Sequence, residues 1–537
     1  MPASSRTRAA ATAASGARVA TGTRGVAVAR RGIGAGTRGV VAAATAVTAL
    51  TVLPLLVVLA DASSAGLAEA ADFLLRPRVG ELLGSTGALV AVTVPATLVL
   101  GTLAAWVVER TALPWPGLWR TLLLAPLAVP AFVSAYAWVT VAPWLDGLAG
   151  AALVTTLAYY PFVFLPVAAL LRALDPSDEE VARSLGLSPA AAVVRTVLPR
   201  LLPALTGGAL LVTLHLLAEY GVLEMMRFQT FTTAIMQRYA VGFADSTGSL
   251  LASVLLTLCL LALTLEVVAR GRRRVARVGS GAQRPAPRAA LGAWTVPVLA
   301  GLVAVVALAL VVPVGTVGRW LLRALAEPDA SSAGLVQVTV ATIGLALLGG
   351  LAAIVAALPG AWLVNRYRTT LAVLLERATY LASALPGVVV GLALVTIAVD
   401  WARPVYQTTW LTVLAYAILF LPRAMVSLRA GLAAAPPELS ESARSLGLRG
   451  PATLVRVVLP LMAPSVLTGF VLVTLAVSTE LTATLLLAPT GTDTLALAFW
   501  RETSELDYAA AAPYAAVMIA LSVPLTLLLR RHVLEER

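Results

Sequence analysis

Two polar segments, residues 175–203 and 436–464, carry the residues of this chain whose types and spacing repeat. Each contains Ala-Arg-Ser-Leu-Gly-Leu, with a glutamate before the glycine and a Leu-Pro pair after it. The matching residues are Glu180, Ala182, Gly186, Leu198 and Pro199 in the first segment and Glu441, Ala443, Gly447, Leu459 and Pro460 in the second. A glutamate among small residues offers another protein a surface to dock on, and neither segment pairs a nucleophile with a base.

The composition excludes most catalytic and cofactor chemistry. The chain has two histidines and a single cysteine, Cys259, so it has neither an internal disulfide nor a cysteine metal site. It has no lysine, and therefore lacks the lysine with which a P-loop holds ATP phosphates. We expect no catalytic residue, no bound cofactor and no metal site. Any ATP-driven step is expected on a separate polypeptide.

Hydropathy places the two segments in a membrane protein. The 537 residues are 59% hydrophobic and 12% charged, with a mean hydropathy of +0.90. Apolar runs of about 20 residues recur, and a helix of that length crosses the hydrocarbon core. The sequence therefore predicts an all-α polytopic membrane protein. The net charge of +12 comes from arginines between the apolar runs, which favours a lipid bilayer over a nucleic acid as partner.

Twelve apolar runs are predicted to span the membrane, six in each half of the chain. They cover residues 39–60, 85–107, 121–142, 148–170, 201–222 and 246–268, then 293–315, 337–364, 378–399, 408–428, 461–487 and 508–529. The predicted organisation is a basic disordered tail (1–38), a first membrane domain (39–269), an arginine-rich linker (270–290), a second membrane domain (291–530) and a short tail (531–537). Most arginines fall on the side of the termini, which predicts that both termini, the linker and both polar segments are cytoplasmic.

The two halves read as an internal duplication. Phe164-Leu165-Pro166 matches Phe420-Leu421-Pro422, and the match resumes through the polar segments after a five-residue shift. Six spans per half give both halves the same orientation, which predicts a parallel repeat about an axis along the membrane normal. Such a repeat leaves a central path between the halves.

Glu219 and Glu480 occupy matching positions late in the fifth span of each half. Ionisable groups deep in membrane spans are costly and are candidates for function. One interpretation is an electronegative throat for a cation, formed by the two carboxylates across the central path. The other is that each glutamate sits near the outer interface and caps the start of the loop that follows.

Local sequence signals predict a helix–turn–helix in each polar segment. Pro176, Ser177 and Asp178 resemble a helix start, and the residues behind them are good helix formers. Gly186 can adopt a positive φ and turn the chain. A second helical piece then runs to Pro199, where the next span is expected to begin.

The spacing Glu-x-Ala-x-x-x-Gly, followed after nine residues by a hydrophobic position, any residue and Leu-Pro, resembles the EAA loop of ABC importer permeases. Val181 and Ser442 replace the family's first alanine, and Thr196 stands at the hydrophobic position. The resemblance implies two fused permease domains of the binding-protein-dependent (MetI-like) type. It also implies two ABC ATPase subunits docked on the EAA loops, an extracytoplasmic substrate-binding protein, and a bacterial inner-membrane location.

Two further stretches resemble the ferric-iron permeases within that family. They are residues 226–235, MRFQTFTTAI, and residues 479–498, TELTATLLLAPTGTDTLALA. The resemblance implies ATP-driven import of ferric iron, with thiamine and phosphonate or polyamine permeases as alternatives. The alternative from a different class of protein is an ion-driven secondary transporter. That class would place ionisable residues throughout the spans and would leave the duplicated loop unexplained.

Overall fold

The computed structural model describes residues 35–64, 66–241, 246–270, 288–326, 332–367, 369–381, 385–448 and 450–534. Across these residues the chain is helical, and its β pairing is a single parallel bridge between Thr111 and Ala289. The all-α prediction is confirmed. Most of the predicted basic tail (1–38) and arginine-rich linker (270–290), and the last residues of the C-terminal tail, lie outside the described residues.

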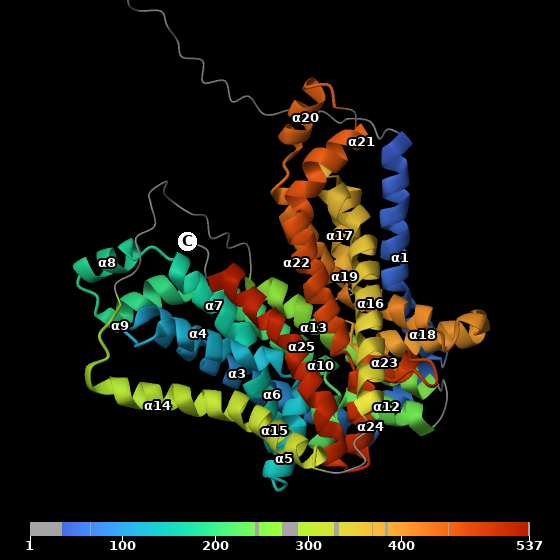
Figure 1. Ribbon diagram of the computed structural model, residues 1–537, viewed down its shortest axis with the longest axis horizontal. Coiled ribbons are helices and arrows are strands. Elements are labelled where there is room, and N and C mark those ends of the chain that lie inside the picture. The colour runs from blue at the N-terminus through green and yellow to red at the C-terminus, as the bar shows by residue number, and fades with distance from the viewer. Residues whose placement is uncertain are drawn as a thin grey trace, which may run out of the picture.

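The first half contains six apolar segments joined by short helices (Figure 1). Its elements are α1 (Ala35–Ser64), α2 (Leu67–Leu74), α3 (Pro77–Arg110), α4 (Pro116–Leu124), η1 (Ala125–Ala128), α5 (Ala131–Val141), α6 (Gly147–Tyr159), α7 (Pro161–Ala173), α8 (Ser177–Ser184), α9 (Pro189–Ala192), η2 (Val193–Val197), α10 (Leu198–Ala218), α11 (Gly221–Met225), α12 (Phe231–Val241) and α13 (Ser246–Arg270).

The second half repeats this order. Its elements are η3 (Gly292–Trp294), α14 (Thr295–Val306), η4 (Ala307–Val311), α15 (Val312–Ala324), α16 (Ser332–Arg366), α17 (Thr370–Leu381), α18 (Gly387–Trp401), η6 (Arg403–Val405), α19 (Thr409–Ala433), α20 (Pro437–Ser445), α21 (Gly450–Thr453), η7 (Leu454–Val458), α22 (Leu459–Ser478), α23 (Thr482–Leu487), α24 (Leu495–Ser504) and α25 (Tyr508–Leu534).

The apolar helices fall at the twelve predicted positions, although they do not all cross as straight spans. In the described part of the chain, nine helices are long and apolar enough to span a membrane, and a bent pair adds a tenth. Two shorter apolar helices, Gly387–Trp401 and Tyr508–Pro524, occupy the remaining two positions. The structure thus supports two repeats of six apolar segments, of which one is bent and two are short.

The third predicted span, 121–142, is broken. The segments Pro116–Ala128 and Ala131–Val141 meet at 90°. A proline has no backbone N–H and forces the residue before it out of the helical region. Val129 accordingly takes an extended ψ of 116° before Pro130. Pro130 and the equivalent Pro386 each precede the next helix with an extended ψ, 140° before α5 and 147° before α18, so both halves start this helix in the same way.

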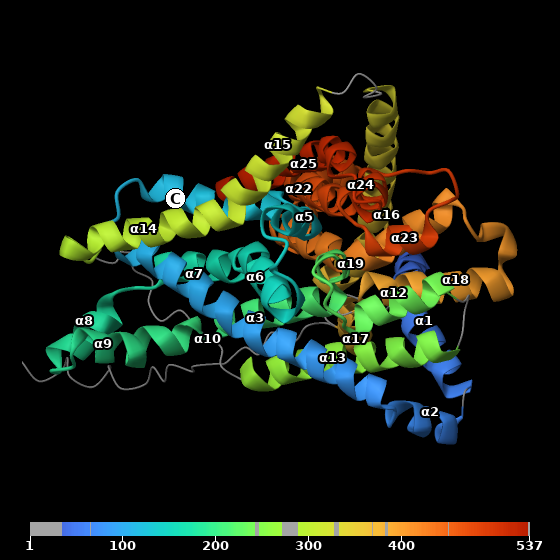
Figure 2. The same cartoon turned by 90° about the horizontal axis from the view of Figure 1, so that it is seen from below.

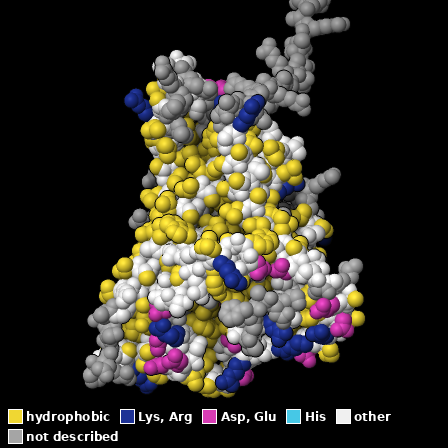
Figure 3. Space-filling view, turned by 90° about the vertical axis from the view of Figure 1, so that its right-hand side faces the viewer, with side chains coloured by type: hydrophobic (Ala, Val, Ile, Leu, Met, Phe, Trp, Pro, Cys, Tyr) yellow, Lys and Arg dark blue, Asp and Glu magenta, His cyan; other side chains and the backbone are white. Residues whose placement is uncertain are grey.

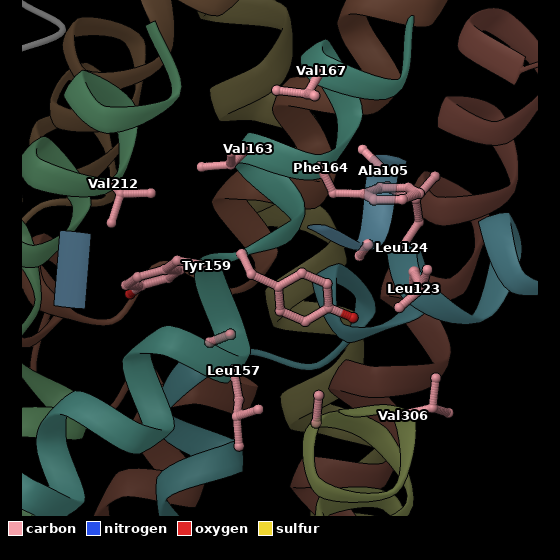
Figure 4. Packing of buried hydrophobic residues seen from close by; sticks show 14 of the residues in the cluster. Ala105, Leu123, Leu124, Leu157, Tyr159, Val163, Phe164, Val167, Val212 and Val306 are labelled. Carbon is pink, nitrogen blue, oxygen red and sulfur yellow. The ribbon is translucent and has the colours of Figure 1, made fainter. Parts of the chain in front are cut away.

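The first span of each half packs against the other half. Helix α1 contacts α16, α17 and α18, whereas α14 and α15 contact α4 and α5. Figure 4 shows the consequence in the core of the first half. There Val306 of α14 lies near Leu123 and Leu124 of α4, below Phe164 of α7. This exchange interlocks the two halves.

The two halves meet at one end of the molecule and diverge toward the other. In Figures 1 and 2 the first half runs out to α8 and α9, and in Figure 1 the second half runs up to α20 and α21. At the opposite end, Phe132 and Tyr136 of the first half share a buried cluster with Leu481 and Phe499 of the second. The Tyr136 hydroxyl also donates a hydrogen bond to the Tyr508 carbonyl at 2.6 Å. The halves are therefore packed against each other at this closed end, whereas the duplicated segments, α8–α9 and α20–α21, lie far apart (Figure 1).

The surface has the distribution expected of a membrane protein. Figure 3 shows a broad apolar face, with arginine and acidic side chains gathered toward its lower part and arginines near its upper end. The apolar side chains of α1 and α22 are largely unburied by the rest of the chain. Such helices need a lipid environment around them.

Candidate functional site

The glycine of each duplicated segment closes a short helix. Gly186 has a φ of +89° and follows α8, which ends at Ser184. The Leu187 amide donates to the Ala182 carbonyl at 3.2 Å, and the Gly186 amide donates to the Arg183 carbonyl at 3.0 Å. These two bonds form a Schellman motif, in which the residue after the helix adopts a positive φ.

The second copy has the same turn. Gly447 has a φ of +88°, and the Leu448 amide donates to the Ala443 carbonyl at 3.1 Å. Ala182 and Ala443 are both buried. The alanine and the glycine four residues later therefore occupy the C3 and C′ positions of a Schellman motif in both segments. A Cβ added to Gly186 or Gly447 would meet nothing within 4 Å, so conformation and not internal crowding requires glycine there.

The second helical piece and the span that follows it form one continuous helix around Pro199. An apolar helix runs from Pro189 to Ala218, with Ser188 as its N-cap accepting from the Ala191 amide at 3.3 Å. A π-turn at Val193–Val197 lies immediately before Leu198 and Pro199. Because proline has no N–H and crowds the carbonyl four residues earlier, a wider turn lets the helix continue. The second copy places the same π-turn before Pro460.

Ion pairs hold the first segment against the spans. Arg110, at the end of α3, contacts Glu179 of α8 at 3.4 Å, and Asp178 pairs with Arg200 of α10. The positions that match Asp178 and Arg200 are Leu439 and Leu461 in the second half. The two segments therefore share a backbone shape and differ in how they are anchored.

Both segments present apolar side chains to solvent. Leu185 and Leu446, beside the turning glycines, are 79% and 85% exposed. Glu180 and Glu441 are exposed as well. Leu198 and Leu459, next to the prolines, are also exposed. Exposed leucines beside acidic side chains make a surface suited to a protein partner.

Glu219 and Glu480 both cap the short helix that follows them. Glu219 accepts from the Val222 amide at 3.1 Å and from the Tyr159 hydroxyl. Glu480 accepts from the Ala483 amide at 3.0 Å and from the Thr484 amide at 3.1 Å. Carboxylates at a helix N-terminus satisfy amides that have no partner within the helix.

The two glutamates lie near the closed end of the molecule. The residues that follow them, Tyr220 and Leu481, pack in the cluster that joins the halves. The contacts of both carboxylates match the capping interpretation. A contribution of Glu219 and Glu480 to the translocation path stays a prediction.

Two polar residues of the spans were not predicted as site residues. His215 in α10 packs its ring against Phe162 at 4.6 Å and against Tyr159 at 5.6 Å. Arg423 lies near the middle of α19, with its guanidinium over Phe420 and its side chain exposed. A signal for Arg423 was its position within an otherwise apolar run.

Comparison with known proteins agrees with the duplicated architecture. Residues 97–275 and 348–533 each match the family described as "Binding-protein-dependent transport system inner membrane component". The chain belongs to this family. The permease is 35% identical over 480 residues to the "Fe(3+)-transport system permease protein FbpB 2" of Haemophilus influenzae, covering 89% of this chain and 95% of that protein.

More distant relatives match one part of the permease. The "Sulfate transport system permease protein CysW" of Escherichia coli is 27% identical over 38% of this chain and 77% of its own length. The "Putative 2-aminoethylphosphonate transport system permease protein PhnV" of Salmonella typhimurium is 29% identical over 29% of this chain and 59% of its own length. The permease is thus a multi-pass inner-membrane transport subunit and not an enzyme. Its family works with an ATPase and a substrate-binding protein.

Proposed function

We propose that this permease carries ferric iron into the cell. The observation that supports this most directly is its likeness to the Haemophilus influenzae Fe(3+) permease, which extends through both halves and nearly the whole of each chain. The sulfate and phosphonate relatives are less similar and match a shorter part of the chain. Among the described residues, no cluster of His, Cys, Asp or Glu could hold a metal ion. In this proposal iron is substrate in transit, and the binding protein would carry most of the selectivity.

Transport would proceed by alternating access. The halves meet through Phe132, Tyr136, Leu481 and Phe499 and diverge toward the duplicated segments, as an inward-facing state requires. Closure of two ATPase subunits would bring the segments at 175–200 and 436–461 together. The interlocked first spans would then carry the motion to the outer end and open it to the binding protein.

We infer that each duplicated segment is a coupling loop that seats one of two ATPase subunits. The exposed Leu185 and Leu446 would enter the partner, and the Schellman turns would hold them in place. The boundaries of the two permease domains follow the repeat, with the arginine-rich linker and both termini in the cytoplasm. The start of α1 beside α21, and α25 against α4, are consistent with termini on the side of the coupling loops (Figure 1).

Uptake by the reconstituted system tests this proposal. Proteoliposomes containing the permease and its ATPase, given binding protein loaded with radiolabelled ferric iron outside, should accumulate iron when ATP is inside. Omission of ATP or of the binding protein should abolish uptake. ATP-dependent accumulation of sulfate or 2-aminoethylphosphonate without iron uptake would overturn the assignment of substrate and leave the coupling mechanism standing.

A further inference from the structure

A cavity of about 700 Å³ lies beside the second duplicated segment and has no assigned occupant. It is lined by α1, α16 and α22, together with residues of the segment itself. All three helices are apolar and long enough to span the membrane. The cavity therefore lies where a membrane helix bundle meets the coupling loop.

The lining of the cavity is apolar along the helices and polar at one end. Ile354, Leu358, Met462 and Val466 are among the apolar lining residues. The polar end is formed by Asn365, Arg366, Ser440 and Thr453. Leu358 is 47% exposed and Val355, which also lines the cavity, is 60% exposed, so the cavity opens along an exposed apolar face of α16.

Comparison of the two halves shows that Arg366 lacks the acidic partner of its counterpart, Arg110. The sequence Ala105-Trp-Val-Val-Glu-Arg110 at the end of α3 matches Ala361-Trp-Leu-Val-Asn-Arg366 at the end of α16. In the first half, Arg110 pairs with Glu179 of the coupling loop at 3.4 Å. In the second half the arginine is kept, but Ser440 stands where Glu179 would be.

The anion that balances Arg110 is therefore missing at Arg366. Within the described part of the chain, no carboxylate lies within ion-pairing distance of Arg366, which is half-buried in the last turn of α16. A half-buried guanidinium without a counterion is costly, and an external anion would stabilise it. Phosphate suits it because arginine can bind two phosphate oxygens at once.

We propose that this cavity binds an anionic phospholipid of the cytoplasmic leaflet. An acyl chain occupies the apolar part along α16 and α22, and the phosphate binds Arg366, with Asn365 and Ser440 beside it. A soluble anion would use the polar end and leave the apolar part empty, whereas a lipid fills both. The surrounding helices lie in the membrane, so lipid is the molecule that reaches the cavity first.

The position of the site gives the bound lipid a role in coupling. Ser440 and Thr453 belong to the second duplicated segment, and Gly39 and Val40 belong to the exchanged helix α1. A lipid here braces the second segment against the spans, as the Arg110–Glu179 pair braces the first. Lipid binding does not depend on which substrate is carried, so the two proposals fail separately.

Native mass spectrometry of the purified permease in detergent tests the site. The delipidated chain is titrated with dioleoyl phosphatidylglycerol or dioleoyl phosphatidylcholine. The wild type should bind one phosphatidylglycerol at least tenfold more tightly than phosphatidylcholine. Arg366→Gln should abolish this preference, and Ala43→Phe, which fills the cavity and keeps the charge, should weaken the binding of both lipids.

Matched variants make the result decisive. Arg110→Gln removes the equivalent arginine of the first half and should keep the lipid preference, as should Arg403→Gln at the exposed η6. Unfolding temperatures of all variants verify that each is folded. Equal binding of the two lipids by the wild type, or an unchanged preference in Arg366→Gln, would overturn the proposal. Displacement of the lipid by millimolar inorganic phosphate would assign the site to a free anion instead and would also overturn it.

Discussion

Substitutions at Gly186 and Gly447 distinguish two reasons why a coupling loop needs glycine: its positive φ, and the close approach of the partner's backbone. Gly186 and Gly447 have φ values of +89° and +88°, which L-residues with a side chain rarely adopt. A Cβ at either position meets nothing within 4 Å in this chain. Alanine therefore adds backbone strain and no internal clash. Asparagine tolerates a positive φ and is larger than alanine, which makes it the matched control for size.

The strain sets the size of the expected effect. A non-glycine residue in the left-handed region costs about 1–2 kcal/mol. If the ATPase recognises only the native turn, Gly447→Ala should weaken its binding by roughly 5- to 30-fold, since about 1.4 kcal/mol corresponds to a factor of ten. Gly447→Asn should lose less, and Gly447→Val should lose most because β-branched residues are the least tolerant of positive φ.

The measurement is the affinity of the detergent-solubilised permease for its ATPase, determined for each variant at Gly186 and at Gly447. The account predicts the order Gly, Asn, Ala, Val from tightest to weakest. An order that follows side-chain volume, with Asn weaker than Ala, would refute the conformational argument. Close approach of the partner's backbone would then be the reason for glycine.

Three further changes test other contacts. Glu480→Ala removes the acceptor of the Ala483 and Thr484 amides and should lower the free energy of unfolding by about 1–2 kcal/mol. Glu480→Gln keeps an acceptor oxygen and should keep iron uptake. Loss of uptake in a folded Glu480→Gln permease would favour the charged throat. Tyr136→Phe removes the 2.6 Å bond to the Tyr508 carbonyl and should cost about 1 kcal/mol; an unchanged unfolding temperature would contradict a tie between the halves. Arg120→Met removes the 2.6 Å partner of the buried Glu109 and leaves it paired only with Arg172 at 3.7 Å, which should lower the free energy of unfolding by about 1–3 kcal/mol. An unchanged unfolding temperature would contradict a stabilising role for the Arg120–Glu109 pair.

The coupling loops were predictable because their determinants are local. The four-residue spacing from Ala182 to Gly186, and from Ala443 to Gly447, is typical of a Schellman motif. Its recurrence at the same topological position in both halves indicates a duplication. The spans were predictable because a run of about 20 apolar residues suffices for each. For Glu219 and Glu480 the sequence left two interpretations, a helix cap and a cation throat, because both roles require a glutamate at the end of a span.

Other features depend on contacts that sequence does not encode locally. Pro130 breaks the third span, and the packing of α5 against α11 and α15 accompanies its 90° turn. The exchange of α1 and α14 between halves leaves both helices apolar, so their composition does not reveal which half they contact. Among the described residues, the lack of a carboxylate beside Arg366 became visible only when the pairing of Arg110 with Glu179 was known.

Cross-linking tests the central claim most directly, namely that both duplicated segments receive an ATPase. The sole native cysteine, Cys259, is buried, so an introduced cysteine can be labelled selectively. Leu185→Cys and Leu446→Cys, each carrying a photoactivatable label, should both cross-link to the ATPase in the assembled complex, whereas Leu75→Cys, equally exposed between α2 and α3, should not. Cross-links from Leu75, or none from either segment in a complex that still forms, would contradict the account.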